Sequence, residues 1–139
     1  MIRLDKRTHT IFTIILLIWA VAVAYLCFGH FEQEMEHHWS IFGITDDKIV
    51  HFCMFFPFPF IAWLAFDKMT KKFWHSVFFV ILTFIAGCVL AAATEIGQSF
   101  TDYRTGDIAD FRTDAFAMGI CSLIVFILDI SKQAKHDEE

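Results

Sequence analysis

The sequence predicts an all-α integral membrane protein, a bundle of four transmembrane helices built from a single domain, residues 1–139. Three observations predict this class. Hydrophobic residues make up 57% of the chain, charged residues only 19%, and the mean hydropathy is +0.55, which is more apolar than ordinary soluble domains. The 18 Phe and 4 Trp are too many large apolar side chains for the interior of so small a soluble protein. Four apolar stretches are also each about 20 residues long, the length that crosses a bilayer.

The first apolar stretch, residues 10–28, follows a basic N-terminal segment and predicts the first span. A cleaved signal peptide is the alternative, because a basic start followed by Ala20, Ala22 and Ala24 imitates a cleavage region. We favour a retained membrane anchor. The four cysteines fall one in each apolar stretch and lack the paired spacing of a zinc site, so we interpret them as packing residues.

The second span, residues 49–66, contains Pro57 and Pro59. A proline lacks an N–H and crowds the carbonyl four residues earlier, so the carbonyls of Cys53 and Phe55 lose their helical donors. Inside a bilayer such carbonyls need other donors. The prolines therefore predict either a packed kink or a break that lets the start of the helix line a cavity.

The third span covers residues 77–100 and the fourth covers residues 111–128. In the third span, Gly87, Ala91 and Glu95 recur every four residues, which places them on one face of a helix. Small residues allow another helix to approach closely at that face, and they direct Glu95 into the bundle and away from lipid.

The distribution of Lys and Arg predicts the orientation of the bundle. Eight lie in the N-terminal segment, the loop between the second and third spans, and the C-terminal tail, whereas only Lys48, Arg104 and Arg112 lie on the other side. Because cytoplasmic segments carry the excess of basic residues, both termini are predicted to be cytoplasmic. This orientation gathers the unusual polar residues at the outer membrane face. Polar groups confined to one face leave no evident relay, which disfavours a proton-coupled transporter.

The polar residues at that face come from three segments, and within each helical stretch their spacing places them on one side of a helix. They are Asp47, Lys48 and His51 in the first segment, Glu95 and Gln98 in the second, and Arg104, Asp107, Asp110 and Asp114 in the third. An ionisable group inside a span costs about 2.5 to 3.5 kcal/mol, so Glu95 and Asp114 are expected to face partners and not lipid. The basic partners available are Lys48, His51, Arg104 and Arg112.

These residue types suggest specific roles. The candidate acid–base residues are His51, Glu95 and Asp110, because imidazole and carboxyl groups can exchange a proton with a bound ligand. The candidate ligand-binding residues are Asp47, Lys48, Gln98 and Arg104, of which Lys48 and Arg104 suit an anionic head group. A divalent metal, Mg²⁺ or Mn²⁺, is a further alternative, held by Glu95, Asp110 and Asp114, since such ions prefer carboxylate oxygens.

The order of these motifs resembles the VanZ-like membrane protein family. DDKIVHF opens the second span, and TEIGQSFTDYRTGDIADFRTDAF leads from the third into the fourth; the match extends over the second to fourth spans, residues 46–119. The matching positions are Asp47, Lys48, His51 and Phe52, then Glu95 and Gln98, then Arg104 and Asp110. Asp114 stands where the family usually has Asn and adds a negative charge beside Asp110. Ala117 stands where the family usually has Gly, which suggests a slightly looser helix contact.

The resemblance implies a multi-pass protein of the bacterial cytoplasmic membrane that contributes to resistance to the glycopeptide teicoplanin. It does not imply a reaction, so two classes of function stay open, and so does the question of catalysis. In the first, the protein binds or processes a lipid-linked phosphate or another envelope precursor at the outer leaflet. In the second, the charged residues form an internal network that fixes helix register, and the protein acts by binding a partner or the drug. Nucleic acid is not an expected partner, because the net charge is −5 and no basic patch with interleaved aromatic residues occurs.

Overall fold

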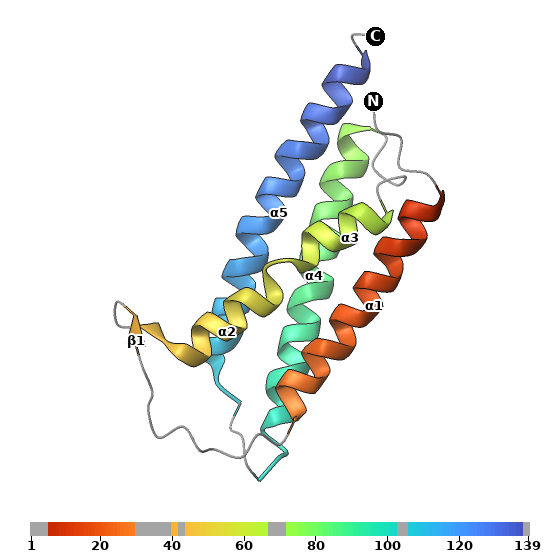
Figure 1. Ribbon diagram of the computed structural model, residues 1–139. Coiled ribbons are helices and arrows are strands. Elements are labelled where there is room, and N and C mark those ends of the chain that lie inside the picture. Colours follow the sequence, from red (N-terminus) through yellow and green to blue (C-terminus); the bar gives the residue numbers. More distant parts are fainter. Residues whose placement is uncertain (1–5, 30–39, 42–43, 67–71, 103–105, 138–139) are drawn as a thin grey trace.

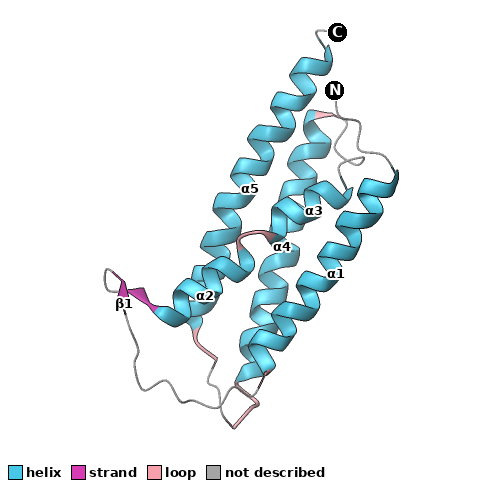
Figure 2. Ribbon diagram, in the orientation of Figure 1, coloured by secondary structure: helices cyan, strands magenta, loops and turns pink. Residues whose placement is uncertain are grey.

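The computed structural model describes residues 6–29, 40–41, 44–66, 72–102 and 106–137, and these residues are almost entirely helical (Figures 1 and 2). The helices are α1 (Lys6–Phe28), α2 (Asp46–Phe55), α3 (Phe58–Phe66), α4 (Phe73–Gln98) and α5 (Ile108–Asp137). Two short strands, β1 (Ser40–Ile41) and β2 (Ile44–Thr45), pair antiparallel, with Ser40 opposite Thr45.

Four helical segments are long and apolar enough to cross a membrane: Lys6–Phe28, Asp47–Phe66, Phe73–Gln98 and Ile108–Lys135. The predicted all-α fold with four long apolar helices is therefore confirmed, and these helices have the length and composition of a multi-pass membrane protein. All four candidate spans begin earlier than predicted, at Lys6, Asp47, Phe73 and Ile108, because each helix starts before the apolar stretch. Large apolar side chains cover the outside, for example Val21 at 70% and Phe78 at 65% exposure, as expected of helices that contact lipid.

The helices run alternately up and down. In Figure 1, α1 begins and α5 ends at the upper end of the bundle, whereas α1 and α4 end, and α2 and α5 begin, at the lower end. A small apolar core joins four helices through Val23, Cys27, Phe55, Ala91 and Met118, all of them fully buried. The lower and upper ends, by contrast, contain the buried polar side chains described below.

The second span is divided at its prolines, so of the two predicted alternatives, a packed kink and a break, the structure has the break. α2 ends at Phe55 and α3 begins at Phe58, so the break falls at the first proline. The Trp19 indole N–H donates to the carbonyl of Met54 at 2.8 Å, and its ring stacks on Phe58 with 4.8 Å between centroids. A donor from α1 thus replaces the helical hydrogen bond at the break. Beyond the break α3 packs on α1, whereas α2 turns away to pack on α5.

The small residues predicted to face the bundle from α4 do so. A Cβ atom added to Gly87 would collide with the Met118 side chain and lie 3.0 Å from the Phe58 ring, so a larger residue would require Met118 to move. Ala91 is fully buried and Glu95 is 8% exposed. The same helical face therefore leads from the close packing at Gly87 to the carboxyl group at the lower end.

Candidate functional site

Side chains from all three predicted segments meet at the lower end of the bundle. We call this group the carboxylate–histidine cluster; its members are Asp47, Lys48, His51, Glu95, Asp107, Asp110 and Asp114. The break in the second span explains the assembly, because it turns α2 onto α5. The antiparallel packing of α4 on α5 then brings Glu95 alongside.

His51 lies at the centre of the cluster and is 3% exposed. Its Nδ1 atom is 3.2 Å from both carboxylate oxygens of Asp114, which is fully buried. The same nitrogen is 3.8 Å from Oε1 of Glu95. With Asp114 ionised, its carboxylate can only accept a hydrogen bond, and Nδ1–H of His51 would be the donor. Asp114 therefore fixes the orientation of the imidazole ring, and the two residues form a histidine–carboxylate pair.

Lys48 sits on the more exposed side of the cluster, with 32% of its side chain accessible. Its Nζ atom lies 3.6 Å from Oδ1 of Asp110 and 3.9 Å from Oδ2 of Asp107. Both distances are longer than the roughly 2.7 to 3.2 Å of a hydrogen bond. The ammonium group therefore attracts these carboxylates without being fully engaged by them, which leaves donors available to an anionic ligand.

Glu95 is engaged through only one of its two carboxylate oxygens. Oε2 accepts the backbone N–H of Asp107 at 2.8 Å, and this contact depends on Gly106, where a Cβ atom would collide with the backbone carbonyl of Glu95. Oε1 of Glu95 is buried and has no hydrogen-bond donor among the described residues, and the same holds for Oδ1 of Asp110. Two buried carboxylate oxygens thus lack donors within the described part of the chain.

Asp107 also has a local role at the start of α5. Its Oδ1 accepts the backbone N–H of Ala109 at 2.8 Å, the usual contact of an aspartate that caps the first turn of a helix. The side chain is 49% exposed. Asp107 therefore helps to end the loop and start the helix, in addition to lying near Lys48.

Two predicted ligand-binding residues are not seen in the cluster. The buried amide of Gln98 donates to the backbone carbonyl of Cys27 at 3.1 Å, so Gln98 joins the end of α4 to the end of α1. Arg104 lies outside the described residues, and its pairing with the cluster stays a prediction. Arg112, named as a possible partner of the buried carboxylates, is exposed on α5.

The predicted metal ligands fall into two groups instead of one. The ligand atoms of His51, Glu95 and Asp114 lie within 4.8 Å of one another, and so do those of Asp47, His51 and Asp110. The expectation of a single set made of Glu95, Asp110 and Asp114 therefore needs correction. Asp110 and Asp114 are one turn apart on α5, and the packing of α2 across them places His51 in both groups. Sequence reasoning had missed His51 as a possible ligand.

A second buried carboxyl group, Asp129 at 1% exposure, lies toward the upper end of α5. Its Oδ1 accepts the Trp63 indole N–H at 3.0 Å, and its Oδ2 accepts Ser76 Oγ–H at 2.5 Å and the Gln133 amide at 3.1 Å. Lys132 lies over the Trp63 ring, 5.6 Å from its centroid. We call these five residues the Asp129 cluster.

The expectation that unusual polar groups are confined to one end is therefore wrong. Helical spacing gave a signal, since Asp129 continues the stripe of buried carboxylates along α5.

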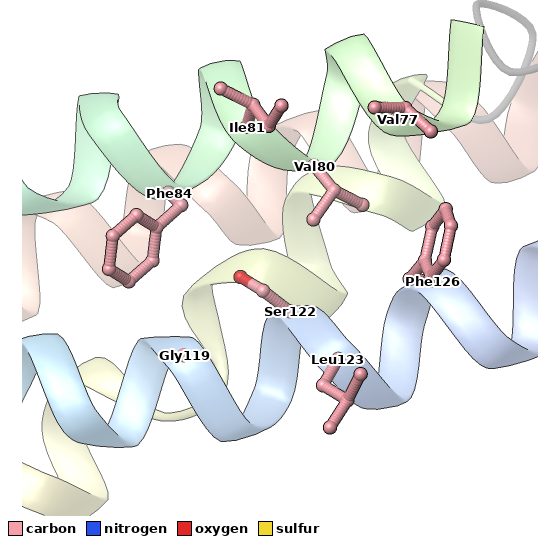
Figure 3. A pocket seen from close by; sticks show the side chains of 8 residues that line it. All are labelled: Val77, Val80, Ile81, Phe84, Gly119, Ser122, Leu123 and Phe126. Atoms are coloured by element: carbon pink, nitrogen blue, oxygen red, sulfur yellow. The ribbon is translucent and has the colours of Figure 1, made fainter. Parts of the chain in front are cut away.

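An apolar groove of about 380 Å³ runs between α4 and α5 (Figure 3). Its lining is Val77, Val80, Ile81 and Phe84 from α4 with Gly119, Ser122, Leu123 and Phe126 from α5. Figure 3 shows the Ser122 hydroxyl turned from α5 toward α4, and its oxygen is buried with no hydrogen-bond partner among the described residues. Apart from that hydroxyl, the groove offers only hydrocarbon contacts.

The cluster combines an oriented imidazole, a partly free ammonium group and carboxylate oxygens without donors, which are suited to binding an ion or a polar head group and to moving a proton. Comparisons of the chain with protein-family models, with curated proteins and with solved structures give no match. Its function therefore has to be argued from this geometry and from the sequence motifs.

Proposed function

We propose that this chain is a VanZ-like protein of the bacterial cytoplasmic membrane that binds a lipid-linked phosphate of the cell envelope at the carboxylate–histidine cluster and contributes to teicoplanin resistance. The observation that carries the proposal is the position of Lys48. Its ammonium group is partly exposed, lies at 3.6 and 3.9 Å from two carboxylates, and stands beside the buried His51–Asp114 pair.

The surroundings of Lys48 favour an anionic head group. α2 and α5 both begin at this end of the bundle, and the N-terminus of a helix carries a partial positive charge that attracts phosphate. Arg104, predicted to lie in the same region, would add a bidentate donor. The candidate acid–base residues are His51, Glu95 and Asp110, of which His51 has the best-defined orientation. Any reaction on the bound head group would use these residues.

The helical bundle also offers a place for the hydrocarbon part of such a ligand. The groove between α4 and α5 belongs to the same helix pair that carries Glu95 and Asp114, and its walls are apolar. A prenyl or acyl tail in that groove would remain among side chains of its own polarity. The head group and the tail of one ligand would thus contact different parts of the same two helices.

The proposed orientation places the cluster at the outer leaflet and both termini in the cytoplasm. It is supported by the excess of Lys and Arg at the opposite end of the spans and by the common end at which α1 begins and α5 ends. A reporter that works only in the cytoplasm should be active when it is fused after Glu139. Activity of a reporter that requires the far side of the membrane would reverse the orientation.

Lipid binding can be tested on the purified protein with a polyprenyl phosphate, measured by native mass spectrometry. Lys48→Ala should weaken binding by about 10- to 100-fold, the equivalent of a charge-assisted hydrogen bond of about 1.5 to 3 kcal/mol. Lys72→Ala removes the same charge from the opposite end and should leave binding unchanged. In cells, Lys48→Ala should remove the protection against teicoplanin, and Lys72→Ala should retain it. Equal binding by both variants would reject this site.

A second candidate function, a purely structural network, is favoured by one observation. His51 bonds to Asp114, and Glu95 accepts the Asp107 N–H, so the cluster does join α2, α4 and α5. If this were its whole role, Lys48→Ala would lower the unfolding temperature and the amount of folded protein without a selective loss of lipid binding. The donor-free oxygens of Glu95 and Asp110 are the feature that a structural network does not explain.

A further inference from the structure

The carboxylate–histidine cluster contains five carboxyl groups and, among the described residues, two basic side chains. Three of its carboxyl groups, Glu95, Asp110 and Asp114, are less than 9% exposed, and Lys48 and His51 are the only basic side chains placed with them in the described part of the chain. Burying carboxylates without compensating positive charge is costly, and more so near the apolar interior of a membrane. A bound cation would supply that compensating charge.

A second, independent observation locates where a cation would bind. Glu95 is about nine-tenths buried, and its Oε1 has no hydrogen-bond donor among the described residues. That oxygen is directed at the imidazole of His51, 3.8 Å from Nδ1. An ion bound by both residues would account for this buried oxygen without a donor.

The distances fit such an ion. Two ligands at about 2.1 Å from a metal and at roughly right or tetrahedral angles lie about 3.0 to 3.4 Å apart. The separation of Nδ1 of His51 from the Asp114 oxygens is 3.2 Å, which matches without movement. The 3.8 Å between Nδ1 and Oε1 of Glu95 requires only a small adjustment of the Glu95 side chain.

We infer that His51, Glu95 and Asp114 form a binding site for one divalent first-row transition-metal ion. The metal binds Nδ1 of His51, whose proton moves to Nε2 so that the imidazole stays neutral, and the Asp114 and Glu95 carboxylates supply one oxygen each. A set of one imidazole and two carboxylates suits Mn²⁺ or Zn²⁺ better than Mg²⁺, which prefers oxygen ligands alone. The neighbouring group of Asp47, His51 and Asp110 is less suitable, because Asp47 is exposed.

The ion would give the acidic cluster the positive charge that a phosphate needs. This role toward the lipid rests on the proposed function, whereas binding of the ion itself does not. The metal ion would lie beside Lys48, so that ligand phosphate oxygens would meet two positive charges in place of a surplus of carboxylates.

The test uses Mn²⁺ added alone to the full-length protein after chelator treatment, with binding followed by electron paramagnetic resonance. Mn²⁺ avoids capture by the four cysteines, since thiolates select softer ions. One ion should bind per chain. Glu95→Gln and Asp114→Asn should each weaken binding at least about tenfold, the smallest loss usual even for outer-shell changes. Asp107→Asn, which alters an exposed carboxylate of the same cluster and keeps a capping side chain, should change it less than about threefold.

Circular dichroism and the unfolding temperature would confirm that each variant is folded, and for wild type Mn²⁺ should raise the unfolding temperature. The inference is overturned if wild type binds no Mn²⁺, or if Asp107→Asn weakens binding as much as Glu95→Gln, because the cluster would then act as a diffuse acidic patch. Polyprenyl phosphate binding with chelator present separates the two proposals. Retained lipid binding without any Mn²⁺ uptake would reject the metal site alone, and Mn²⁺ uptake without lipid binding would reject the lipid alone.

Discussion

Two buried aspartates on α5 have very different hydrogen-bond partners. Asp114 lies at the lower end of the helix and Asp129 lies toward the upper end. Asp129 receives hydrogen bonds from three neutral donors on α3, α4 and α5. Asp114 contacts one imidazole, and that imidazole is shared with Glu95, whose Oε1 has no donor in the described residues. Both carboxylate oxygens of Asp129 accept hydrogen bonds, whereas the carboxylate–histidine cluster contains oxygens that have no donor among the described residues.

The difference shows how a buried charge in a membrane bundle can be interpreted. A carboxylate surrounded by donors from several helices holds those helices together and requires no ligand. A set of carboxylates with surplus charge and donor-free oxygens gains from a ligand that completes it. Burial alone does not distinguish these cases, since Asp114 and Asp129 are 0% and 1% exposed. The number of hydrogen-bond donors around each carboxylate oxygen distinguishes the two cases.

The largest effect on stability is expected at the upper end. Asp129→Ala would leave the Trp63 indole, the Ser76 hydroxyl and the Gln133 amide without their common acceptor, at a cost of about 2 to 4 kcal/mol. Glu95→Gln keeps an oxygen that can accept the Asp107 N–H, so its cost should stay below about 1 kcal/mol. Unfolding of both variants in the same detergent would measure the difference.

Asp129→Asn is the matched control for that experiment, because it keeps the shape and one acceptor oxygen while it adds an N–H₂ group beside Ser76 and Gln133. Its cost should fall between those of the other two variants. A Glu95→Gln protein that unfolds more easily than Asp129→Ala would mean that the lower cluster, and not the upper one, holds the helices together.

Much of the fold could be predicted from the sequence, because the apolar stretches determine where the long helices lie. Four apolar stretches predicted four spans, and the small residues Gly87 and Ala91 predicted the buried face of α4 that carries Glu95. Pro57 and Pro59 predicted a kink or a break in the second span, since proline removes helical hydrogen bonds. The convergence of His51, Glu95 and Asp114 also followed, because helical spacing and alternating direction place them at one end.

The remaining details depend on which helices pack together, and local spacing does not contain that information. Gln98 donates to the backbone carbonyl of Cys27, 71 residues away. Every residue has a backbone carbonyl, so the sequence does not indicate which one is the acceptor. Asp129 lies just beyond the predicted end of the fourth span at residue 128, so no prediction from the sequence included it, although its helix continues to Asp137. The division of the expected metal ligands into two groups likewise depends on the direction that α2 takes after the break.

A smaller effect is expected at Gly106, which supports the lower cluster without contributing any charge. A Cβ atom at this position would collide with the Glu95 carbonyl, so Gly106→Ala should displace the loop and lengthen the bond from the Asp107 N–H to Oε2 of Glu95. We expect a loss of about 1 kcal/mol in stability together with weaker Mn²⁺ binding, because Glu95 loses the contact that orients it.

Gly119→Ala provides the comparison, since the added Cβ atom would lie 3.8 Å from the Phe84 ring, an ordinary van der Waals contact. In the middle of α5, alanine should stabilise the helix by about 0.5 to 1 kcal/mol relative to glycine, with Mn²⁺ binding unchanged. If Gly106→Ala lowered stability but left Mn²⁺ binding at the wild-type value, the orientation of Glu95 by Asp107 would be irrelevant to the ion. The affinity of the carboxylate–histidine cluster for Mn²⁺ would then depend on charge alone. The arrangement of hydrogen bonds around Glu95 would no longer explain why this cluster differs from the Asp129 cluster.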